Sequence, residues 1–217
     1  MILELMQSRR SVRRFKPDLP ERALLAKLLE AAVCAPSASN KQPWRFLVVT
    51  DRRVIQRLAD AVRQAVETIA AHIEPSFEPA FRSYGDYFTR FEGAPALIIP
   101  LYRSLTLLSN MTSQDLGAAE RAAIDLMERN SGLIGTSLAI QNLLLMAHAS
   151  GLGASGMTGP IVAVGALRDI LQVPDSWQVA ALIPVGFPDE DPKPTARKPV
   201  EAVVRWIEPT RGEYDER

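Results

Sequence analysis

The stretch AIQNLLLMAHASGLGASG, residues 139–156, contains a G-x-G-x-x-G motif at residues 151–156. This motif marks a Rossmann fold when its glycines connect a strand to a helix whose N-terminus holds a pyrophosphate. Upstream, however, residues 132–150 are rich in Leu, Ala and Met, which predicts a buried helix with Gly151 at its C-terminus. Downstream, Gly159 and Pro160 stand where the phosphate-binding helix would begin. The context therefore argues against a Rossmann domain, and the glycines need another explanation.

Composition indicates one domain with no strong overall charge. The chain has 217 residues, enough for a single sizeable core, and its 25 basic residues balance 25 acidic ones. No global field therefore favours a nucleic acid or a membrane surface. The first sixteen residues differ, because Glu4 is their only acid beside five cations: Arg9, Arg10, Arg13, Arg14 and Lys16. This cluster is either a local anion site or a solvated basic surface.

The few cysteines and histidines limit the chemistry that side chains can supply. The single cysteine, Cys34, excludes an intramolecular disulfide, and its place at the end of an apolar helix pattern predicts a buried, inert thiol. His72 and His148 are far apart in sequence, so neither a metal site nor a catalytic triad is expected. No run reaches the ~18–20 apolar residues of a membrane span, and no signal-peptide hydrophobic region begins the chain. We therefore expect a soluble, cytoplasmic protein.

Hydrophobic periodicity predicts an α+β domain with helices around an antiparallel or mixed sheet. Asp51 is expected to cap a helix that begins after it, and Pro100 should limit the hydrogen bonding of its strand. Residues 74–92, with six aromatics, predict an irregular or short-helical excursion. Strands are expected at residues 45–50, 96–102 and 177–187, and helices at residues 2–6, 20–35, 55–69, 113–130, 132–150 and 166–173.

The C-terminal residues 188–217 are rich in proline and charge, with a short apolar pattern of Val200, Val203, Val204, Trp206 and Ile207. Such a segment cannot form its own core. It must therefore lie across the rest of this subunit or across a partner.

Three segments carry groups suited to a phosphorylated heterocycle. In SRRSVRRF, residues 8–15, the guanidiniums and Ser11 offer donors to a phosphate. In APSASNKQPW, residues 35–44, hydroxyls and the Asn40 and Gln42 amides can pair with the donors and acceptors of a ring. In GLGASG, residues 151–156, missing side chains allow the backbone to approach a flat ligand.

The order and spacing of these segments resemble the FMN-dependent nitroreductase family. The resemblance covers nearly the whole chain and includes VAALIPVGFP at residues 179–188 and ARKPVEAVV at residues 196–204. It implies an α+β sandwich whose mostly antiparallel sheet is flanked by helices. It also implies an intertwined homodimer with two FMN sites at the interface, in which residues 188–217 of the single domain wrap the partner subunit.

The resemblance also implies roles for particular residues. Two departures are that residues 155–159 (Ser-Gly-Met-Thr-Gly) replace the bulky or aromatic residues that many members carry just after the GLG, and that Thr195 stands where some relatives have a basic residue. The implied contacts are Arg9, Arg10, Ser11 and Arg13 with the phosphate and ribityl chain; Arg197, with Lys193 as a further candidate, with the phosphate; Pro36, Ser37, Asn40 and Gln42 with the flavin of the other subunit; and Ser155 and Gly156 with the reactive edge of the ring.

The implied activity is electron transfer from NAD(P)H through FMN to a nitro, quinone or related acceptor by a ping-pong mechanism. FMN N5 then carries the hydride, and no catalytic side chain is required. Two alternatives stay open: a flavoenzyme of the same fold acting as a dehalogenase, enone reductase or dehydrogenase, and a non-catalytic FMN-binding protein. Residues 77–91 and 104–130 are each either a lid or scaffold. The sequence selects neither the acceptor nor NADH over NADPH.

Overall fold

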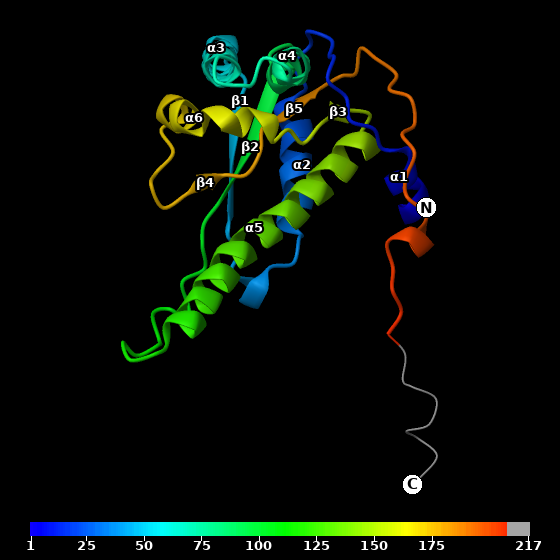
Figure 1. The fold of residues 1–217 in the computed structure, drawn as a ribbon. Helices are drawn as coiled ribbons and strands as arrows, with labels where there is room; N and C mark the ends of the chain where they lie inside the picture. Colours follow the sequence, from blue (N-terminus) through cyan, green and yellow to red (C-terminus); the bar gives the residue numbers. More distant parts are fainter. Residues whose placement is uncertain (208–217) are drawn as a thin grey trace.

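The sheet at the centre of the fold is antiparallel in every pairing between its strands within residues 1–207, the part of the chain that this computed structural model describes. The strand order is β1–β2–β5–β3, and β4 also pairs with β2. Figure 1 shows the sheet between helical layers. The mostly antiparallel α+β fold expected from the sequence is therefore confirmed. The strands are β1 (Trp44–Val49), β2 (Ala96–Tyr102), β3 (Gly153–Ala154), β4 (Gln178–Val179) and β5 (Ile183–Gly186).

Pro100 interrupts one side of the central strand β2. On the β1 side the register is continuous, with Phe46 opposite Pro100. On the other side β2 pairs with β5 before Pro100 and with β4 after it. Proline has no N–H to donate to a neighbouring strand. The partner of β2 can therefore change from β5 to β4 at Pro100 without loss of a hydrogen bond from a Pro100 N–H. Residues 177–187, expected as one strand, are consequently split into β4 and β5.

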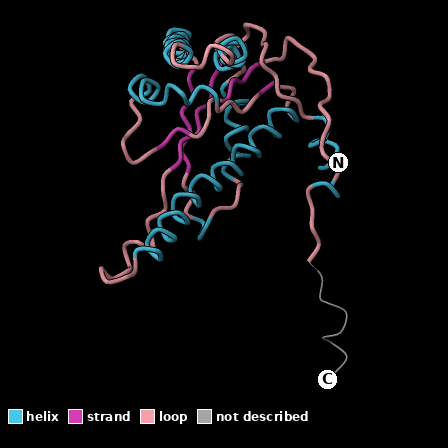
Figure 2. The backbone as a smooth tube through the Cα atoms, in the orientation of Figure 1, coloured by secondary structure: helices cyan, strands magenta, loops and turns pink. Residues whose placement is uncertain are grey.

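Alternating side chains of the sheet enter two separate cores. One core lies under α3 and α6 and receives Leu97, Ile99 and Leu101 of β2. The other lies under α2 and α5 and receives Ala96 and Ile98 of the same strand. This period of two is that of a strand with both faces covered. Figure 2 shows the strands running between these helical layers.

The shorter helices begin near the positions that the sequence predicts. Asp51 caps α3, because its carboxylate accepts a hydrogen bond from the Arg53 N–H at 2.8 Å. The aromatic excursion forms short helices followed by a turn, and its Phe88 and Phe91 are buried in the core that contains α3. Cys34, however, is exposed where α2 ends, which corrects the expected buried thiol. The helices are α1 (Ile2–Ser8), α2 (Arg22–Val33), α3 (Arg52–Ala70), α4 (Glu78–Gly85) and α6 (Val164–Leu171), with 3₁₀ turns η1 (Ala38–Asn40), η2 (Asp86–Thr89), η3 (Gly159–Ala163) and η4 (Val200–Ala202).

One long helix, α5 (Ala118–Ala149), replaces the two helices expected at residues 113–130 and 132–150. Gly132 lies inside this helix. The position requires a glycine because a side chain there would collide with the backbone carbonyl of Arg103. By length and composition alone α5 could cross a membrane, whereas no run of that length was expected from the sequence. Core helices share that property, and Ala139, Leu143 and Ala147 of α5 pack against α2 and the sheet.

The glycine motif ends α5 and does not begin a phosphate-binding helix. Gly151 has φ +74° and follows the last helical turn, while the Leu152 N–H donates to the Ala147 carbonyl at 2.9 Å. The chain then enters β3, where a side chain at Gly153 would come within 2.6 Å of Val12. Gly153 is therefore required for packing against the N-terminal segment, and the rejection of a Rossmann motif is confirmed.

The C-terminal tail is tied to the N-terminal segment at its start and is exposed beyond. The Lys16 N–H donates to the Phe187 carbonyl at 2.9 Å, and the Glu190 carboxylate accepts from the N–H groups of Arg13 and Arg14 at 2.5 and 3.1 Å. Further on, the tail leaves the helix and sheet layers (Figure 1), and Trp206 is 79% exposed. Residues 208–217 of the expected extension lie outside the described residues.

Candidate functional site

Arginines from both ends of the chain meet at the C-terminal end of α5. Arg9 and Arg10 follow α1, and Arg197 comes from the tail. Burial, together with the charges of Arg197 and Arg10, lowers the pKa of Arg9. Arg9, Arg10 and Arg197 therefore lie near enough to one another for their charges to interact. Within residues 1–207, Arg9, Arg10, Arg13 and Arg197 form no ion pair with a carboxylate. We call Arg9, Arg10 and Arg197 the arginine cluster; Arg13 follows them on the same N-terminal segment.

Arg14 does not share this character. Its guanidinium donates to the Asp189 carbonyl at 3.2 Å and lies 3.7 Å from a Glu190 carboxylate oxygen. Arg14 therefore anchors the tail, which explains how one of five N-terminal cations is neutralised. Lys193 is exposed and has no hydrogen bond or ion pair among the described residues.

His148 lies beside the arginine cluster and was not expected there. Its Nε2 is 2.9 Å from the Ser8 Oγ, which joins the end of α5 to the end of α1. Burial, followed by the charges of Arg9 and Arg10, lowers the pKa of His148. The one feature of the sequence that could have indicated this position of His148 is its place in the last turn of the helix before the glycine motif.

The turn after β3 lies against the same N-terminal segment. Ser11 forms an isolated bridge with Ala154, and the Val12 N–H donates to the Ala154 carbonyl at 3.2 Å. Ser155 is fully buried, yet its hydroxyl has no hydrogen-bond partner in the described chain. Because an unsatisfied buried hydroxyl is costly, this atom suits a polar ligand atom. Gly156 is exposed, and a side chain there would meet only Leu144, at 3.9 Å.

The polar segment before β1 has an unusual backbone. Ser39, Asn40 and Gln42 have φ values of 49°, 51° and 47°. Residues other than glycine rarely adopt this left-handed conformation, which concentrates at functional sites. The Ser37 Oγ fixes the segment by accepting a hydrogen bond from the Gln42 N–H at 2.9 Å. The geometry of this segment is therefore maintained against a conformational cost.

One chain does not bring all expected site residues together. Ser37 lies next to Gly135, with its Cβ 3.4 Å from the position of an added glycine Cβ, whereas the arginine cluster adjoins His148. At 1.5 Å per residue these positions on α5 are about 20 Å apart. The structure thus joins Arg9, Arg10, Ser11, Arg197 and Ser155, and places Pro36, Ser37, Asn40 and Gln42 apart from them.

An exposed apolar surface adjoins the isolated segment. Pro36 and Ser37 face Ile134, Gly135 and Leu138 of α5 across a shallow cavity of about 290 Å³. Ile134 is 59% exposed. Further exposed apolar residues belong to the same helix, to α1 and to the tail: Leu126, Met127, Leu133, Ile2, Leu3, Met6, Val200, Val203, Val204 and Ile207. Exposed apolar side chains in this number are typical of a subunit interface.

The donor set fits a phosphate-bearing ligand with a polar ring. Guanidiniums without carboxylates suit a phosphate, and the free Ser155 hydroxyl lies in the adjoining turn. FMN has both chemical features. The residues that a single chain brings together here therefore fit FMN in chemical type.

Comparisons with known proteins agree with this geometry. The model of the nitroreductase family matches residues 6–187. An NADH dehydrogenase of Thermus thermophilus is 32% identical over 201 residues, covering 91% of this chain and 92% of the relative. A BluB-like flavoprotein of Clostridium difficile has a TM-score of 0.83 at 24% identity, covering 96% of this chain and 99% of the other. An iodotyrosine deiodinase bound to FMN and 3-iodo-L-tyrosine has a TM-score of 0.73 at 24% identity, with coverages of 96% and 100%.

The family match extends from α1 to the end of β5 and so includes the arginine cluster apart from Arg197, the strained segment and the turn at Ser155. The prediction made from the order of the sequence segments is thereby confirmed. The chain belongs to the nitroreductase family.

Proposed function

We propose that this protein is an FMN-dependent oxidoreductase that passes electrons from NAD(P)H to a nitro, quinone or related acceptor. The observation that carries the proposal is the uncompensated arginine cluster next to the unpartnered, buried hydroxyl of Ser155. FMN, when bound, would supply the redox chemistry of hydride uptake from the nicotinamide and electron delivery to the acceptor. The names of the relatives, which describe NADH dehydrogenases and a flavoprotein, support this activity.

The protein residues have binding and orienting roles. Arg9, Arg10, Arg13 and Arg197 hold the phosphate by charged hydrogen bonds, and Ser11 contributes a hydroxyl next to them. The Ser155 hydroxyl donates to the ring edge, and the exposed Gly156 leaves that edge open. Donor and acceptor then occupy the same ring face in turn, which produces ping-pong kinetics.

We further propose that the site is completed by a second copy of the chain. Two observations support this: the distance along α5 between Ser37 and the arginine cluster, and the apolar residues that a monomer leaves in water. In the homodimer, Pro36, Ser37, Asn40 and Gln42 of one subunit close over the flavin held by the other. The tail, with Trp206 as its largest apolar anchor, embraces the partner. The compartment that we propose is the cytoplasm.

The activity is tested by identifying the pigment and reducing it. The purified protein should release FMN, identified by mass spectrometry. Anaerobic NADH or NADPH should bleach it, and a nitroarene or quinone should restore the colour. Release of FAD would contradict the site assignment. FMN that neither nicotinamide reduces would instead favour a non-catalytic flavin-binding protein.

The shared site is tested by truncating the chain after Phe187. Because Arg197 and the apolar residues of the tail are lost together, both dimer and FMN should be lost. The measurement is light scattering with flavin absorbance, compared with full-length protein. A full-length monomer with one FMN would overturn the shared site, whereas a truncated dimer with full FMN would overturn only the role of the tail.

A second candidate is reductive dehalogenation of an aromatic substrate. The fold shared with an iodotyrosine deiodinase and the unobstructed position of Gly156 favour it. Incubating reduced, FMN-loaded protein with 3-iodotyrosine and with a nitroarene separates the two activities. Iodide release faster than nitroarene reduction would select the deiodinase.

A further inference from the structure

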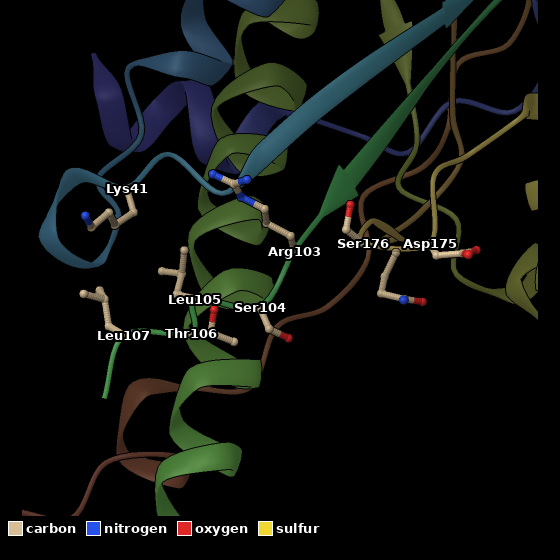
Figure 3. Close-up of a pocket in the computed structure, with 9 residues that line it drawn as sticks. Lys41, Arg103, Ser104, Leu105, Thr106, Leu107, Asp175 and Ser176 are labelled. Carbon is tan, nitrogen blue, oxygen red and sulfur yellow. The ribbon is translucent and has the colours of Figure 1, made fainter. Parts of the chain in front are cut away.

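A cationic cleft lies where β2 ends, next to the strained segment. Its volume is about 660 Å³, and its polar lining includes Lys41, Arg103, Ser104, Thr106, Ser176 and Gln178. These residues come from three parts of the chain: the loop before β1, the loop that follows β2, and residues 175–178 at the start of β4 (Figure 3). The Arg103 N–H donates to the Pro43 carbonyl at 3.2 Å, which joins the cleft to the end of the strained segment. We call this the Arg103 cleft.

Arg103 is held without being neutralised. Its guanidinium lies 5.3 Å from the ring centre of Trp177, and that of Arg45 lies 4.5 Å from the same ring. Stacking of this kind positions a guanidinium while its N–H groups stay available at the edge. Within residues 1–207 the side chains of Arg103 and Lys41 form neither an ion pair nor a hydrogen bond.

The one carboxylate lining the described cleft does not compensate these charges. Asp175 lies at the opposite side of the group from Lys41 in Figure 3, and its carboxylate points away from Arg103. That carboxylate is 3.3 Å from the Arg168 guanidinium, which also donates to the Pro174 carbonyl. The cleft therefore presents two cations and several hydroxyls to a ligand.

A buried carboxylate on α5 holds the loop after β2 that lines part of the cleft. Glu128 accepts hydrogen bonds from the N–H groups of Leu107 and Leu108 at 2.6 Å each, and from the Ser109 hydroxyl at 2.6 Å. The loop that carries Ser104 and Thr106 is thus ordered by the chain itself. A preordered loop loses less conformational freedom when a ligand binds.

We propose that the Arg103 cleft binds the pyrophosphate-bearing adenosine arm of the nicotinamide donor. This rests on the proposed function, because the dihydronicotinamide would then lie over the flavin that the neighbouring strained segment helps to enclose. Two cations and three hydroxyls suit a polyphosphate, and the cleft is far larger than a single carboxylate requires. The smaller anionic group of an acceptor is the competing occupant, which the test separates.

The test is anaerobic stopped-flow reduction of FMN-loaded Arg103→Gln and Lys41→Gln variants. The donors are NADPH, NADH and 1-benzyl-1,4-dihydronicotinamide, which has the reacting ring without phosphates. Each variant should raise the apparent Kd of NADPH and NADH at least about tenfold, the scale of one lost charged hydrogen bond. Reduction by the benzyl compound should stay within about twofold.

A matched control and a binding measurement complete the design. Arg90→Gln removes a guanidinium that lies 3.9 Å from the ring centre of Tyr87 on another surface, so it should change nothing. ADP-ribose, which cannot be reduced or oxidised by the flavin, should bind the wild-type protein in calorimetry and bind both cleft variants more weakly. That readout does not depend on electron transfer, so it separates failure of this proposal from failure of the proposed function.

Three results would overturn the proposal. Equal losses with NADPH and the benzyl compound would assign the effect to a damaged flavin site. Unchanged donor kinetics with weaker oxidation by 4-nitrobenzoate, but not by nitrobenzene, would assign the cleft to the acceptor. Unchanged kinetics and unchanged ADP-ribose binding in both variants would show that the cleft holds neither ligand.

Discussion

The two halves of α5 use charge in opposite ways. In the N-terminal half, Glu128 is surrounded by donors from one loop, and the hydrogen bond from the Ser109 hydroxyl, aided by backbone N–H groups, lowers its pKa. At the C-terminal end, His148 adjoins cations that have no carboxylate partner in the described chain. A charge satisfied by its own chain builds structure. A group of like charges left uncompensated costs stability until a ligand arrives.

Among the variants that test this difference between the two halves of α5, the largest effect is expected from a substitution in the arginine cluster. Arg9→Ala should weaken FMN binding by roughly 1.5 to 3 kcal/mol because charged hydrogen bonds to phosphate are lost. The same change should leave the stability of FMN-free protein equal or higher, since Arg9 repels Arg10 and Arg197. Fluorescence titration of FMN and urea unfolding measure the two quantities.

Arg57→Ala is the control for Arg9, because Arg57 is exposed on α3 and outside the cluster. It should leave both quantities within about 0.5 kcal/mol of wild type. Equal FMN affinities in the two variants would show that the cluster is only a solvated basic surface.

Glu128→Ala should lower the stability of the protein and largely keep its FMN affinity, the reverse of Arg9→Ala. The N–H groups of Leu107, Leu108 and Ser109 would lose their acceptor, so the Tm should fall and limited proteolysis within residues 104–117 should accelerate. FMN affinity should change much less than in Arg9→Ala. Glu128→Gln keeps an acceptor oxygen, so its Tm should lie between those of wild type and Glu128→Ala. A Tm equal to that of wild type in both variants would show that Glu128 does not stabilise the loop.

A smaller effect is expected from pH at His148. Its lowered pKa in the folded chain means that the unfolded chain binds the proton first as pH falls through the ordinary value of about 6.5. Stability should therefore decrease from pH 7.5 to 5.5, and His148→Gln should reduce that decrease. Bound FMN should also reduce it, because a phosphate offsets Arg9 and Arg10. Identical pH profiles of wild type and variant in urea unfolding would contradict this.

The smallest effect is expected at Cys34, which lies outside both ends of α5. Its Sγ donates to the Glu30 carbonyl at 3.2 Å, and a serine can do the same. Cys34→Ser should keep its turnover and alter the free energy of unfolding by no more than about 0.5 kcal/mol. Complete loss of turnover in a folded, FMN-loaded variant would mean that the thiol takes part in electron transfer.

The sequence predicted the fold where local chemistry and tertiary packing agree. The bounds of β2 and the cap of α3 followed from strand composition and from Asp51. The break expected near Gly132 was wrong, because this glycine is needed for close approach to Arg103 and not for ending a helix. The exposure of Cys34 was missed because periodicity does not indicate which residues of a final turn lie beyond the core.

The candidate site was predictable in residue type more than in arrangement. The arginine guanidiniums in SRRSVRRF indicate a phosphate site, and Ser155 was a candidate because it lies in the glycine-rich turn. Three contributions depend on tertiary structure and leave no local pattern: the left-handed backbone of Ser39, Asn40 and Gln42, the approach of Arg197 to Arg9, and the hydrogen bonds of a loop to Glu128. The strained segment and the arginine cluster could not be placed relative to one another from spacing alone.

The meeting of Arg9 with Arg197, reinforced by the bonds of Glu190 to the N–H groups of Arg13 and Arg14, has a consequence for biosynthesis. A nascent chain on the ribosome presents its first arginines early but gains Arg197 only after all the strands of the described sheet have been synthesised. If the proposed site is correct, cofactor loading is a late step, and a premature stop between Phe187 and Arg197 yields a polypeptide with all its described strands and an incomplete phosphate site.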